Sequence, residues 1–303
     1  MNKTIGFIGL GIMGLPMSLN LLKKSDYSIM GYDVFREKRS IFIGNGGRSP
    51  DHVDEIYQNC DIIFLCLPSN NLVKSSIQDI IAKGKKGTII VDLSSTSPTL
   101  IREMYEKAKQ VGIRILDSPV SGGESGAIAG TLVMMCGGDQ EVFDQVSPLL
   151  RYMGSTVTYM GQSGCGSVAK LANNMIVGGY LGAISEGLAF ASKAGLDPET
   201  LFYAIKDGAA GSSVFDLKAP KMISRNFEAS ARIAVHQKDL MNAVQLAEEL
   251  SVEIPMSKMV LDYMNEMEAL GKVNEDHCAI VKIYEKNMGV EIKKQQDVRI
   301  SKN

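Results

Sequence analysis

Lys170 and Asn174 are the residues of this chain whose types and spacing are best suited to chemistry. They stand four apart in Gly166-Ser167-Val168-Ala169-Lys170-Leu171-Ala172-Asn173-Asn174, within a proline-free run from Ser167 to Ala194 that has apolar residues at helical spacing. Residues four apart lie on one face of a helix, one turn from each other. An ammonium group can donate a proton and take it back, while an amide can orient the group that receives it. Taken alone, the pair also fits a solvated lysine on a surface helix beside a capping asparagine.

A glycine-rich loop near the start of the chain indicates a dinucleotide-binding site. An apolar strand at Ile5–Ile8 runs into Gly9-Leu10-Gly11-Ile12-Met13-Gly14, and a helix is predicted to follow. In this context the first glycine allows a tight turn, the second lets a pyrophosphate approach the backbone, and the third lets helix and strand pack closely. The next strand ends at Asp33, whose carboxylate would bond the adenosine ribose and repel a 2′-phosphate. We therefore expect NAD, with NADP possible because Arg36 stands nearby; the alternative is a glycine turn without a ligand.

Two further apolar runs, Asp61–Leu67 and Thr88–Leu93, are typical of strands that are covered on both faces. Small polar residues follow each run, and in open α/β sheets ligands bind at the carboxyl ends of parallel strands. Leu67, Pro68 and Ser95 are therefore our candidates for contact with the nicotinamide half of the cofactor. The alternative is that these are ordinary turn and N-cap residues.

The turn Ser121-Gly122-Gly123 follows a predicted strand at Ile113–Leu116 and the segment Asp117–Val120. A turn with so few side chains can aim its backbone N–H groups and the serine hydroxyl at an anion. A small carboxylate-bearing substrate would suit it. The alternative is a loop that merely needs positive φ angles.

The elements that must position these residues form an α/β Rossmann domain with a mostly parallel, doubly wound sheet, followed by an all-α domain joined to it by a long helix. We place the dinucleotide-binding domain at residues 1–162 and the helical substrate and oligomerisation domain at 163–303. In the second domain, helical spacing predicts helices at 198–207, 213–222, 234–250, 255–269 and 277–288. The polar tail from about 291 is expected to be frayed.

Small residues recur along the long helix, and they indicate close packing against another helix. Their positions are Gly178, Gly179, Gly182, Ala183 and Gly187. The partner helix would lie within the domain or in another subunit, so we expect a homo-oligomer, either a dimer or a tetramer. Polar neighbours such as Lys170 and Glu186 argue against a membrane dimer motif.

Composition excludes several other classes of protein. The net charge of −2 gives no field for nucleic acid or an anionic membrane, and no run of 18 uncharged apolar residues indicates a membrane span. The five cysteines form no C-x-x-C pair, and the three histidines, scattered through the chain, predict no metal site. No signal peptide is evident, so a cytoplasmic location is expected.

Four motifs together resemble the β-hydroxyacid dehydrogenase family. They are the glycine-rich loop, Asp117-Ser118-Pro119-Val120-Ser121-Gly122-Gly123, the Gly166–Asn174 segment and Lys238-Asp239-Leu240. The resemblance implies that Lys170 is catalytic, that Ser121, Gly122, Gly123 and Asn174 bind substrate, and that Lys238 neighbours the nicotinamide. Without the resemblance, the Lys238-Asp239 pair would fit a solvated helix face. At Ala231 and Ala234 the chain departs from related reductases, which commonly carry an aromatic residue and an acid there.

Hydride transfer to a carbonyl needs an acid that neutralises the oxygen as charge develops on it. No histidine follows a strand or shares a face with a partner in the sequence pattern, so Lys170 is the candidate, placed at the expected domain cleft. It would serve provided that desolvation makes its ammonium group easier to deprotonate. The competing class is a non-catalytic dinucleotide-binding module on the same fold.

Overall fold

The computed structural model describes residues 3–293 of the chain. It divides into two compact units, Met1–Lys170 and Leu171–Asn303. The helix α8, Cys165–Lys193, runs through the boundary between them. The division therefore falls inside this helix, later in the chain than the expected boundary at residue 162.

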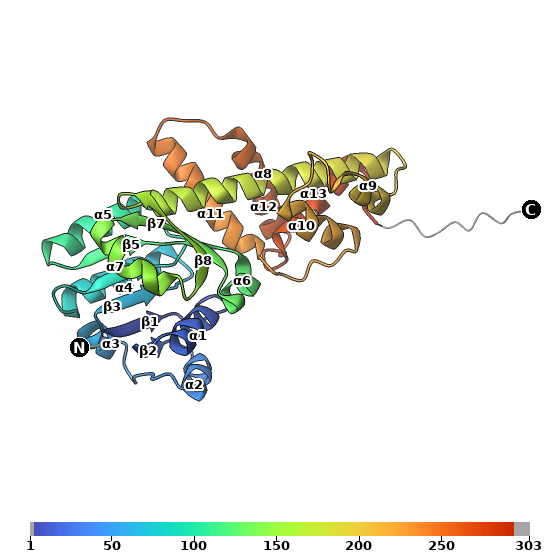
Figure 1. Ribbon diagram of the computed structural model, residues 1–303. Helices are drawn as coiled ribbons and strands as arrows, with labels where there is room; N and C mark the ends of the chain where they lie inside the picture. Colours follow the sequence, from blue (N-terminus) through green and yellow to red (C-terminus); the bar gives the residue numbers. More distant parts are fainter. Residues whose placement is uncertain (1–2, 294–303) are drawn as a thin grey trace, which may run out of the picture. The chain divides into compact units, whose positions relative to one another are not determined.

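The first unit is built on one eight-stranded sheet (Figure 1). Its strand order is β2-β1-β3-β4-β5-β7-β6, with β8 paired to β7. The strands are β1 Thr4–Ile8, β2 Ser28–Tyr32, β3 Ile62–Leu65, β4 Ile89–Asp92, β5 Arg114–Asp117, β6 Val120–Ser121, β7 Leu132–Gly138 and β8 Gly154–Gly161. The first five are parallel, and β7 runs antiparallel to β5 and β6. Strand β2 pairs with one side of β1 and β3 with the other, so the order in which strands are added to the sheet reverses at β1. Folds of this kind bind nucleotides at such a switch point.

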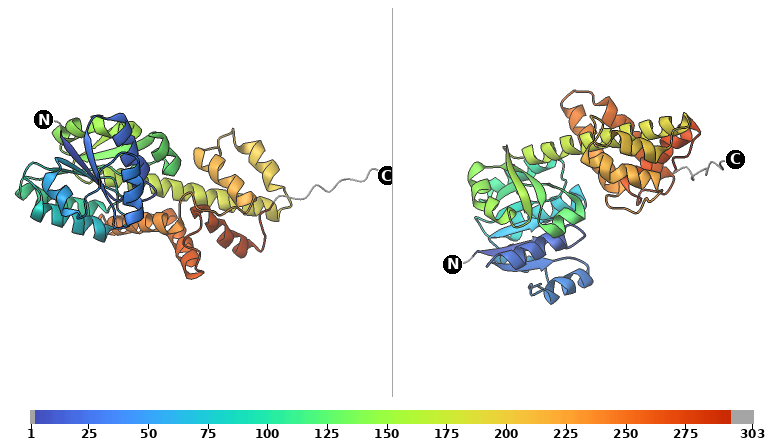
Figure 2. Two further views of the ribbon diagram at one scale, coloured as in Figure 1. Left: turned by 90° about the horizontal axis from the view of Figure 1, so that it is seen from below. Right: turned by 45° about the vertical axis from the view of Figure 1, so that its right-hand side comes forward.

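Helices cover both faces of this sheet (Figure 2). They are α1 Gly14–Lys24, α2 Arg36–Gly44, α3 Asp54–Asn59, α4 Asn70–Lys83, α5 Pro98–Gln110, α6 Gly123–Ala129 and α7 Gln140–Leu150. The side chains of strand β3 are buried in two different hydrophobic cores. Ile62 and Phe64 belong to one core, and Ile63 and Leu65 belong to a second one. Alternate side chains of a strand point to opposite faces, so a strand with two covered faces needs apolar residues throughout. The mostly parallel, doubly wound sheet is confirmed, whereas β6 and α6 were not predicted.

In the described residues of the second unit the regular secondary structure is helical, apart from one isolated bridge between Arg232 and Asp276. After α8 come α9 Pro198–Ile205, α10 Ser213–Ile223, α11 Ile233–Glu249, α12 Pro255–Ala269, the 3₁₀ helix η1 His277–Ile280 and α13 Val281–Met288. The helix expected at 277–288 is thus a 3₁₀ turn followed by an α-helix. The hydrophobic core of the second unit contains Leu181 and Leu188 of α8 together with apolar residues of α9 to α13.

One residue near the start of the tail that is expected to be frayed packs into the hydrophobic core of the second unit. Ile292 is buried, and its N–H donates to Glu285 Oε1 at 2.6 Å. Burying an apolar side chain of this size stabilises the folded chain by roughly 1.5–3 kcal/mol, which favours this position. The remainder of the predicted tail lies outside the described residues.

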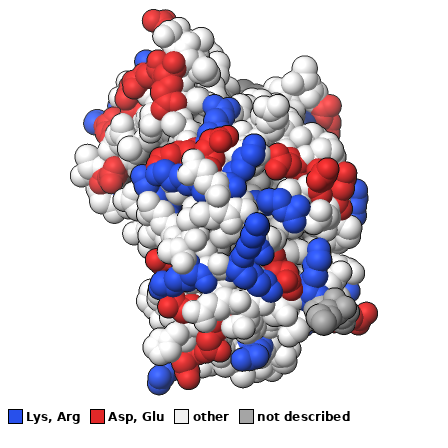
Figure 3. All heavy atoms as spheres, turned by 90° about the vertical axis from the view of Figure 1, so that its left-hand side faces the viewer, with Lys and Arg blue, Asp and Glu red and all other residues white. Residues whose placement is uncertain are grey.

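Charges of both signs lie side by side on the face drawn in Figure 3. Surface ion pairs in the first unit include Lys83 with Asp54 at 2.9 Å and Lys107 with Glu103 at 2.6 Å.

Within the described part of the chain, α8 is the one helix long and apolar enough to cross a membrane by length and composition, which is weak evidence for a membrane protein.

Candidate active site

The β1–α1 loop has the geometry of a dinucleotide site. Gly9 has φ +97°, and a Cβ there would meet the Cys66 carbonyl oxygen at 2.2 Å. A Cβ on Gly14 would meet the Gly9 oxygen at 1.8 Å, so the chain itself requires both glycines. A Cβ on Gly11 would meet nothing within 4 Å. The space beside Gly11 is therefore open, as expected for a glycine that lets a pyrophosphate approach the backbone closely.

Asp33 is fixed beside this loop. Its Oδ2 accepts from Leu10 N at 2.8 Å and its Oδ1 accepts from Phe35 N at 2.9 Å. The N-terminus of α1 has no side-chain cap, so its backbone N–H groups can receive an anion, and Ile12 beside them is exposed. These residues fit a bound dinucleotide: N–H groups for the phosphates and a carboxylate for the ribose.

The carboxyl ends of β3 and β4 are tied to each other. Leu67 N donates to Ser94 Oγ at 2.9 Å, and Ser97 N donates to Asn70 Oδ1 at 3.1 Å. Ser69 caps α4 by accepting from Leu72 N, as the alternative interpretation of this segment allowed. Of the predicted cofactor contacts, Leu67 and Ser95 are half-buried and Pro68 is exposed.

The Ser121-Gly122-Gly123 turn joins β6 to α6. Gly122 has φ +131° and Gly123 has φ +63°, so the turn does need positive φ angles. A Cβ on Gly123 would meet nothing within 4 Å, and both glycines are exposed. The backbone here is therefore accessible to a ligand, with the half-buried Ser121 next to it.

Asp117 anchors the start of α8, a role that the sequence did not reveal. Its Oδ1 accepts from Gly164 N at 2.8 Å and its Oδ2 accepts from Ser167 N at 2.7 Å. Asp117 is 1% exposed, and burial raises the pKa of its carboxyl to about 6, although both backbone N–H donors oppose the rise. The carboxylate thus joins the end of β5 to the first turn of the helix that carries Lys170.

Close backbone packing strengthens this attachment. A Cβ on Gly166 would meet Met135 O at 2.2 Å, and a Cβ on Gly137 would meet Gly166 N at 2.6 Å. Both glycines let α8 begin directly against the sheet. Lys170, on the next turn, is half-buried.

Asn174, one turn after Lys170 on the same helix, belongs to a polar chain in the second unit. Asn173 Nδ2 donates to Asn174 Oδ1 at 2.9 Å, and Asn174 Nδ2 donates to Asp239 Oδ2 at 2.6 Å. Lys238 Nζ lies 3.4 Å from Asp239 Oδ1, and Asp239 is 1% exposed. The Lys238-Asp239 pair is therefore no solvated helix face, because its carboxylate is buried and holds the Asn174 amide.

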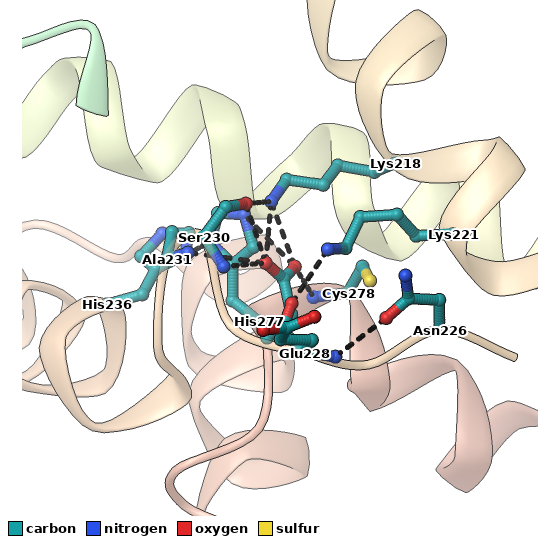
Figure 4. A network of polar contacts seen from close by, with 10 residues as sticks. Lys218, Lys221, Asn226, Glu228, Ser230, Ala231, His236, His277 and Cys278 are labelled. Atoms are coloured by element: carbon teal, nitrogen blue, oxygen red, sulfur yellow. Dashed lines mark hydrogen bonds and ion pairs between the residues drawn. The ribbon is translucent and has the colours of Figure 1, made fainter. Parts of the chain in front are cut away.

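A second buried network joins Lys218, Ser230 and Ala231 (Figure 4) to the carboxylate of Asp276. Lys218 Nζ lies 2.9 Å from Asp276 Oδ1, and Ser230 Oγ and the N–H groups of Ser230 and Ala231 donate to Oδ2. Burial raises the pKa of the Asp276 carboxyl, but the hydrogen bond and the charge of Lys218, together with the other donors around the carboxylate, outweigh burial and hold this pKa well below its usual range. The network ties α10 to the segment before α11 and to η1.

The expectation that the histidines have no partner is wrong. His236 and His277 lie 2.9 Å apart between their Nδ1 atoms, and His236 Nε2 lies 2.9 Å from the Asn174 carbonyl oxygen. Since that oxygen only accepts, His236 donates from Nε2. The two histidines stand 41 positions apart in the chain, so the sequence pattern did not reveal their contact. Among residues 3–293, no three His, Cys, Asp or Glu side chains are grouped so as to hold a metal.

The fold and the glycine-rich loop define a dinucleotide-binding protein. Residues 4–161 match the NAD binding domain of 6-phosphogluconate dehydrogenase, and residues 164–284 match the family described as NAD-binding of NADP-dependent 3-hydroxyisobutyrate dehydrogenase. The chain belongs to the β-hydroxyacid dehydrogenase family and is an NAD(P)-dependent oxidoreductase that acts on the CH–OH group of hydroxyacids. This confirms the expectation of an enzyme over a non-catalytic module.

Three relatives illustrate the similarity. The 2-hydroxy-3-oxopropionate reductase of Escherichia coli (strain K12) is 36% identical over 284 residues, 93% of this chain and 97% of that protein. The 2-(hydroxymethyl)glutarate dehydrogenase of Eubacterium barkeri is 33% identical over 292 residues, 95% and 97% of the two chains. The solved structure of Mycobacterium tuberculosis 3-hydroxyisobutyrate dehydrogenase with L-serine has a TM-score of 0.86 at 28% identity, covering 93% of this chain and 99% of that one.

Proposed function

We propose that the protein interconverts a small 3-hydroxy acid and its 3-oxo acid, with Lys170 as the group that donates and accepts the proton. The observation that carries this proposal is the attachment of α8 to the sheet. Asp117 holds the first turn of the helix through two backbone N–H groups, and Lys170 stands on the next turn. A proton donor on a rigid element keeps its geometry while the substrate carbon changes hybridisation.

Bound NAD(P)H supplies the hydride. In reduction the Lys170 ammonium donates a proton to the carbonyl oxygen, and in oxidation the neutral amine takes the proton back. The Ser121 hydroxyl and the N–H groups of Gly122 and Gly123 bind the substrate carboxylate. Asn174 keeps one amide N–H for Asp239 and orients the reacting oxygen with the other.

Residues of the glycine-rich loop hold the cofactor pyrophosphate in this proposal, and Asp33 holds the adenosine ribose. Leu67, Pro68 and Ser95 contact the nicotinamide half, with Lys238 as a further neighbour. Asp33 favours NADH over NADPH because its carboxylate repels a 2′-phosphate. We also propose that the enzyme works in the cytoplasm as a homo-oligomer.

Tartronate semialdehyde is the substrate that we favour within this class. The similarity to 2-hydroxy-3-oxopropionate reductase over nearly the whole chain supports it. The similarity to 2-(hydroxymethyl)glutarate dehydrogenase makes 2-formylglutarate the second candidate, and methylmalonate semialdehyde is the third.

A substrate screen tests this order. Tartronate semialdehyde, methylmalonate semialdehyde, succinic semialdehyde and 2-formylglutarate are each reduced with NADH and with NADPH. We expect the highest kcat/KM for tartronate semialdehyde, and a higher value for any other acid replaces it. Reduction of propanal as fast as the acids would contradict the carboxylate-binding role of the Ser121–Gly123 turn.

Lys170→Ala tests the chemistry. Loss of a positioned general acid costs on the order of 10²–10⁴ in rate, so kcat falls by that much while NADH affinity and melting temperature stay near those of the wild type. Lys170→Arg rescues poorly, because a guanidinium hardly releases its proton. Lys193→Ala is the matched control, since Lys193 stands on the same helix and donates to the Gly289 carbonyl at 3.1 Å. A kcat of Lys170→Ala within a few-fold of the control would remove Lys170 from the mechanism.

A further inference from the structure

Two buried histidines of the second unit lie against the turn of α8 that carries Asn174. His236 of α11 is 4% exposed and His277 of η1 is 6% exposed, and both are labelled in Figure 4. Their Nδ1 atoms lie 2.9 Å apart, and His236 Nε2 lies 2.9 Å from the Asn174 carbonyl oxygen. The two rings therefore form one line of hydrogen bonds that ends on the backbone of α8.

The chemistry of the two rings determines where their protons lie. A carbonyl oxygen only accepts, so His236 carries a proton on Nε2, and a neutral imidazole then has a bare Nδ1. The contact between the Nδ1 atoms needs one donor, which is the Nδ1–H of His277. Without that donor, His236 is free to carry its proton on Nδ1 instead and to lose the bond to Asn174. His277 thus holds His236 in the tautomer that donates to α8.

We infer that His236 is a positioning residue for the reaction and that it acts through Asn174. This role rests on the proposed function, in which the Asn174 amide orients the reacting oxygen. His236 and Asp239 stand three apart on α11, so they lie on one face of that helix. Asp239 accepts from the Asn174 side-chain amide at 2.6 Å, while His236 donates to the backbone carbonyl of the same residue. One face of α11 thus holds both the main chain and the side chain of Asn174.

The surroundings of His236 keep its ring in place. A Cβ added to the buried Gly178 would lie 3.6 Å from His236 Nε2 and 3.7 Å from its Cε1, so the ring packs directly against the backbone of α8. On the other side, His277 Nε2 lies 4.0 Å from Asp276 Oδ1, and Lys218 Nζ holds the same oxygen at 2.9 Å. A polar group whose neighbours are themselves fixed can hold a reacting group within a narrow geometry.

The expected effect of losing this hydrogen bond is on turnover. A displacement of about 1 Å at a reacting group costs on the order of 10²-fold in rate. His236→Leu removes the donor and should therefore lower kcat by about 10- to 100-fold. KM should change little, because in the proposed function the Ser121–Gly123 turn binds the substrate carboxylate. A merely structural role for His236 predicts a lower melting temperature with a normal kcat in the folded protein.

Kinetics of matched variants test this role, with NADH and whichever of the four screened acids gives the highest kcat/KM. His236→Gln should restore kcat to within a few-fold of the wild type, because its side-chain amide can place an N–H where Nε2 stands. Gln237→Leu is the control. Gln237 is 6% exposed on the same helix, but it donates to Asn265 and Glu268 of α12. Gln237→Leu should keep kcat even where it lowers the melting temperature.

A double-mutant cycle with Asn174→Ala separates this role of His236 from the proposed function. Asn174→Ala alone should lower kcat, and adding His236→Leu should then lower kcat little further, because the residue through which His236 acts is gone. A wild-type kcat for Asn174→Ala would overturn the proposed role of Asn174 and that of His236 with it. A low kcat for Asn174→Ala beside a normal kcat for His236→Leu, or losses that add fully in the double variant, would overturn the role of His236 alone.

Nitrogen-15 NMR of histidine-labelled protein tests the tautomers without substrate, and it does so even if His236→Leu fails to fold. The chain has three histidines, of which His52 is exposed, and His52→Gln and His277→Gln assign the signals. At pH 8 we expect the His236 proton on Nε2 and the His277 proton on Nδ1. A His236 proton on Nδ1 with a bare Nε2 would overturn the inference, because the ring would then have no hydrogen to donate to Asn174.

Discussion

Replacing Asp117 with asparagine should change how the stability of the protein depends on pH. Asp117 is buried at the end of β5 and accepts backbone N–H bonds from Gly164 and Ser167 at the start of α8. Burial raises the pKa of its carboxyl from 3.8 to about 6. The folded chain therefore holds this proton more tightly than the unfolded chain does.

The sign and the size follow from that difference. A raised carboxyl pKa means that the folded state binds more protons between pH 4 and pH 6, so the stability from Asp117 is fully present below about pH 4 and is lost as the pH rises through 6. A shift of about two units corresponds to about 3 kcal/mol. Asparagine has nearly the same shape but cannot ionise. The free energy of unfolding of the wild type minus that of Asp117→Asn should therefore fall by about 3 kcal/mol from pH 4 to pH 7.

Urea unfolding followed by circular dichroism at pH 4, 5, 6 and 7 measures this difference. Lost hydrogen bonding in the variant adds an offset that does not depend on pH, so the slope is the diagnostic quantity. Asp262→Asn, at an exposed position of α12, controls for the removal of a carboxylate. A difference between wild type and Asp117→Asn that stays constant or grows with pH would refute the titration of Asp117 in this range.

Three further predictions follow from the site and its supports. Asp33→Ala should narrow the preference for NADH over NADPH, measured as the ratio of kcat/KM values, because it removes the charge that repels a 2′-phosphate; an unchanged ratio would point to another determinant. Gly123→Ala should raise KM for the acid substrate more than it lowers kcat, since Gly123 has φ +63° and a methyl group there has open space but strains the turn; equal loss of both parameters would argue against an anion-binding turn. Lys218→Met should lower the free energy of unfolding by roughly 3–5 kcal/mol, because it leaves the Asp276 carboxylate buried without its cation, and adding Asp276→Asn should recover part of the loss in denaturant titrations.

Local patterns in the sequence were enough to predict the glycine-rich loop and the parallel strands of the dinucleotide-binding unit. Several sequence signals in this unit depend on only a few neighbouring residues. They are the glycines of the β1–α1 loop, Asp33 at the end of β2 and the apolar run of β3. A turn, a strand covered on both faces and a helix start leave such signatures because backbone sterics and periodicity act over short distances. The long helix α8 was predicted for the same reason.

Only the tertiary structure decided which distant polar groups meet. Asp117 reaches Gly164 and Ser167 across 47 and 50 residues, and Lys218 reaches Asp276 across 58. A buried charge is tolerated only where a partner compensates for its lost hydration, and that partner is supplied by packing rather than by spacing along the chain.

The small residues of α8 show the same division most plainly. The sequence presents Gly179, Gly182, Ala183 and Gly187 as one series of small positions. The fold places Gly179 and Gly182 against Met256 and Tyr284 of their own unit, and turns Ala183 and Gly187 to solvent. Spacing determines that a helix can be approached closely, but which face is already occupied depends on where the other helices pack, and that is a property of the folded chain alone.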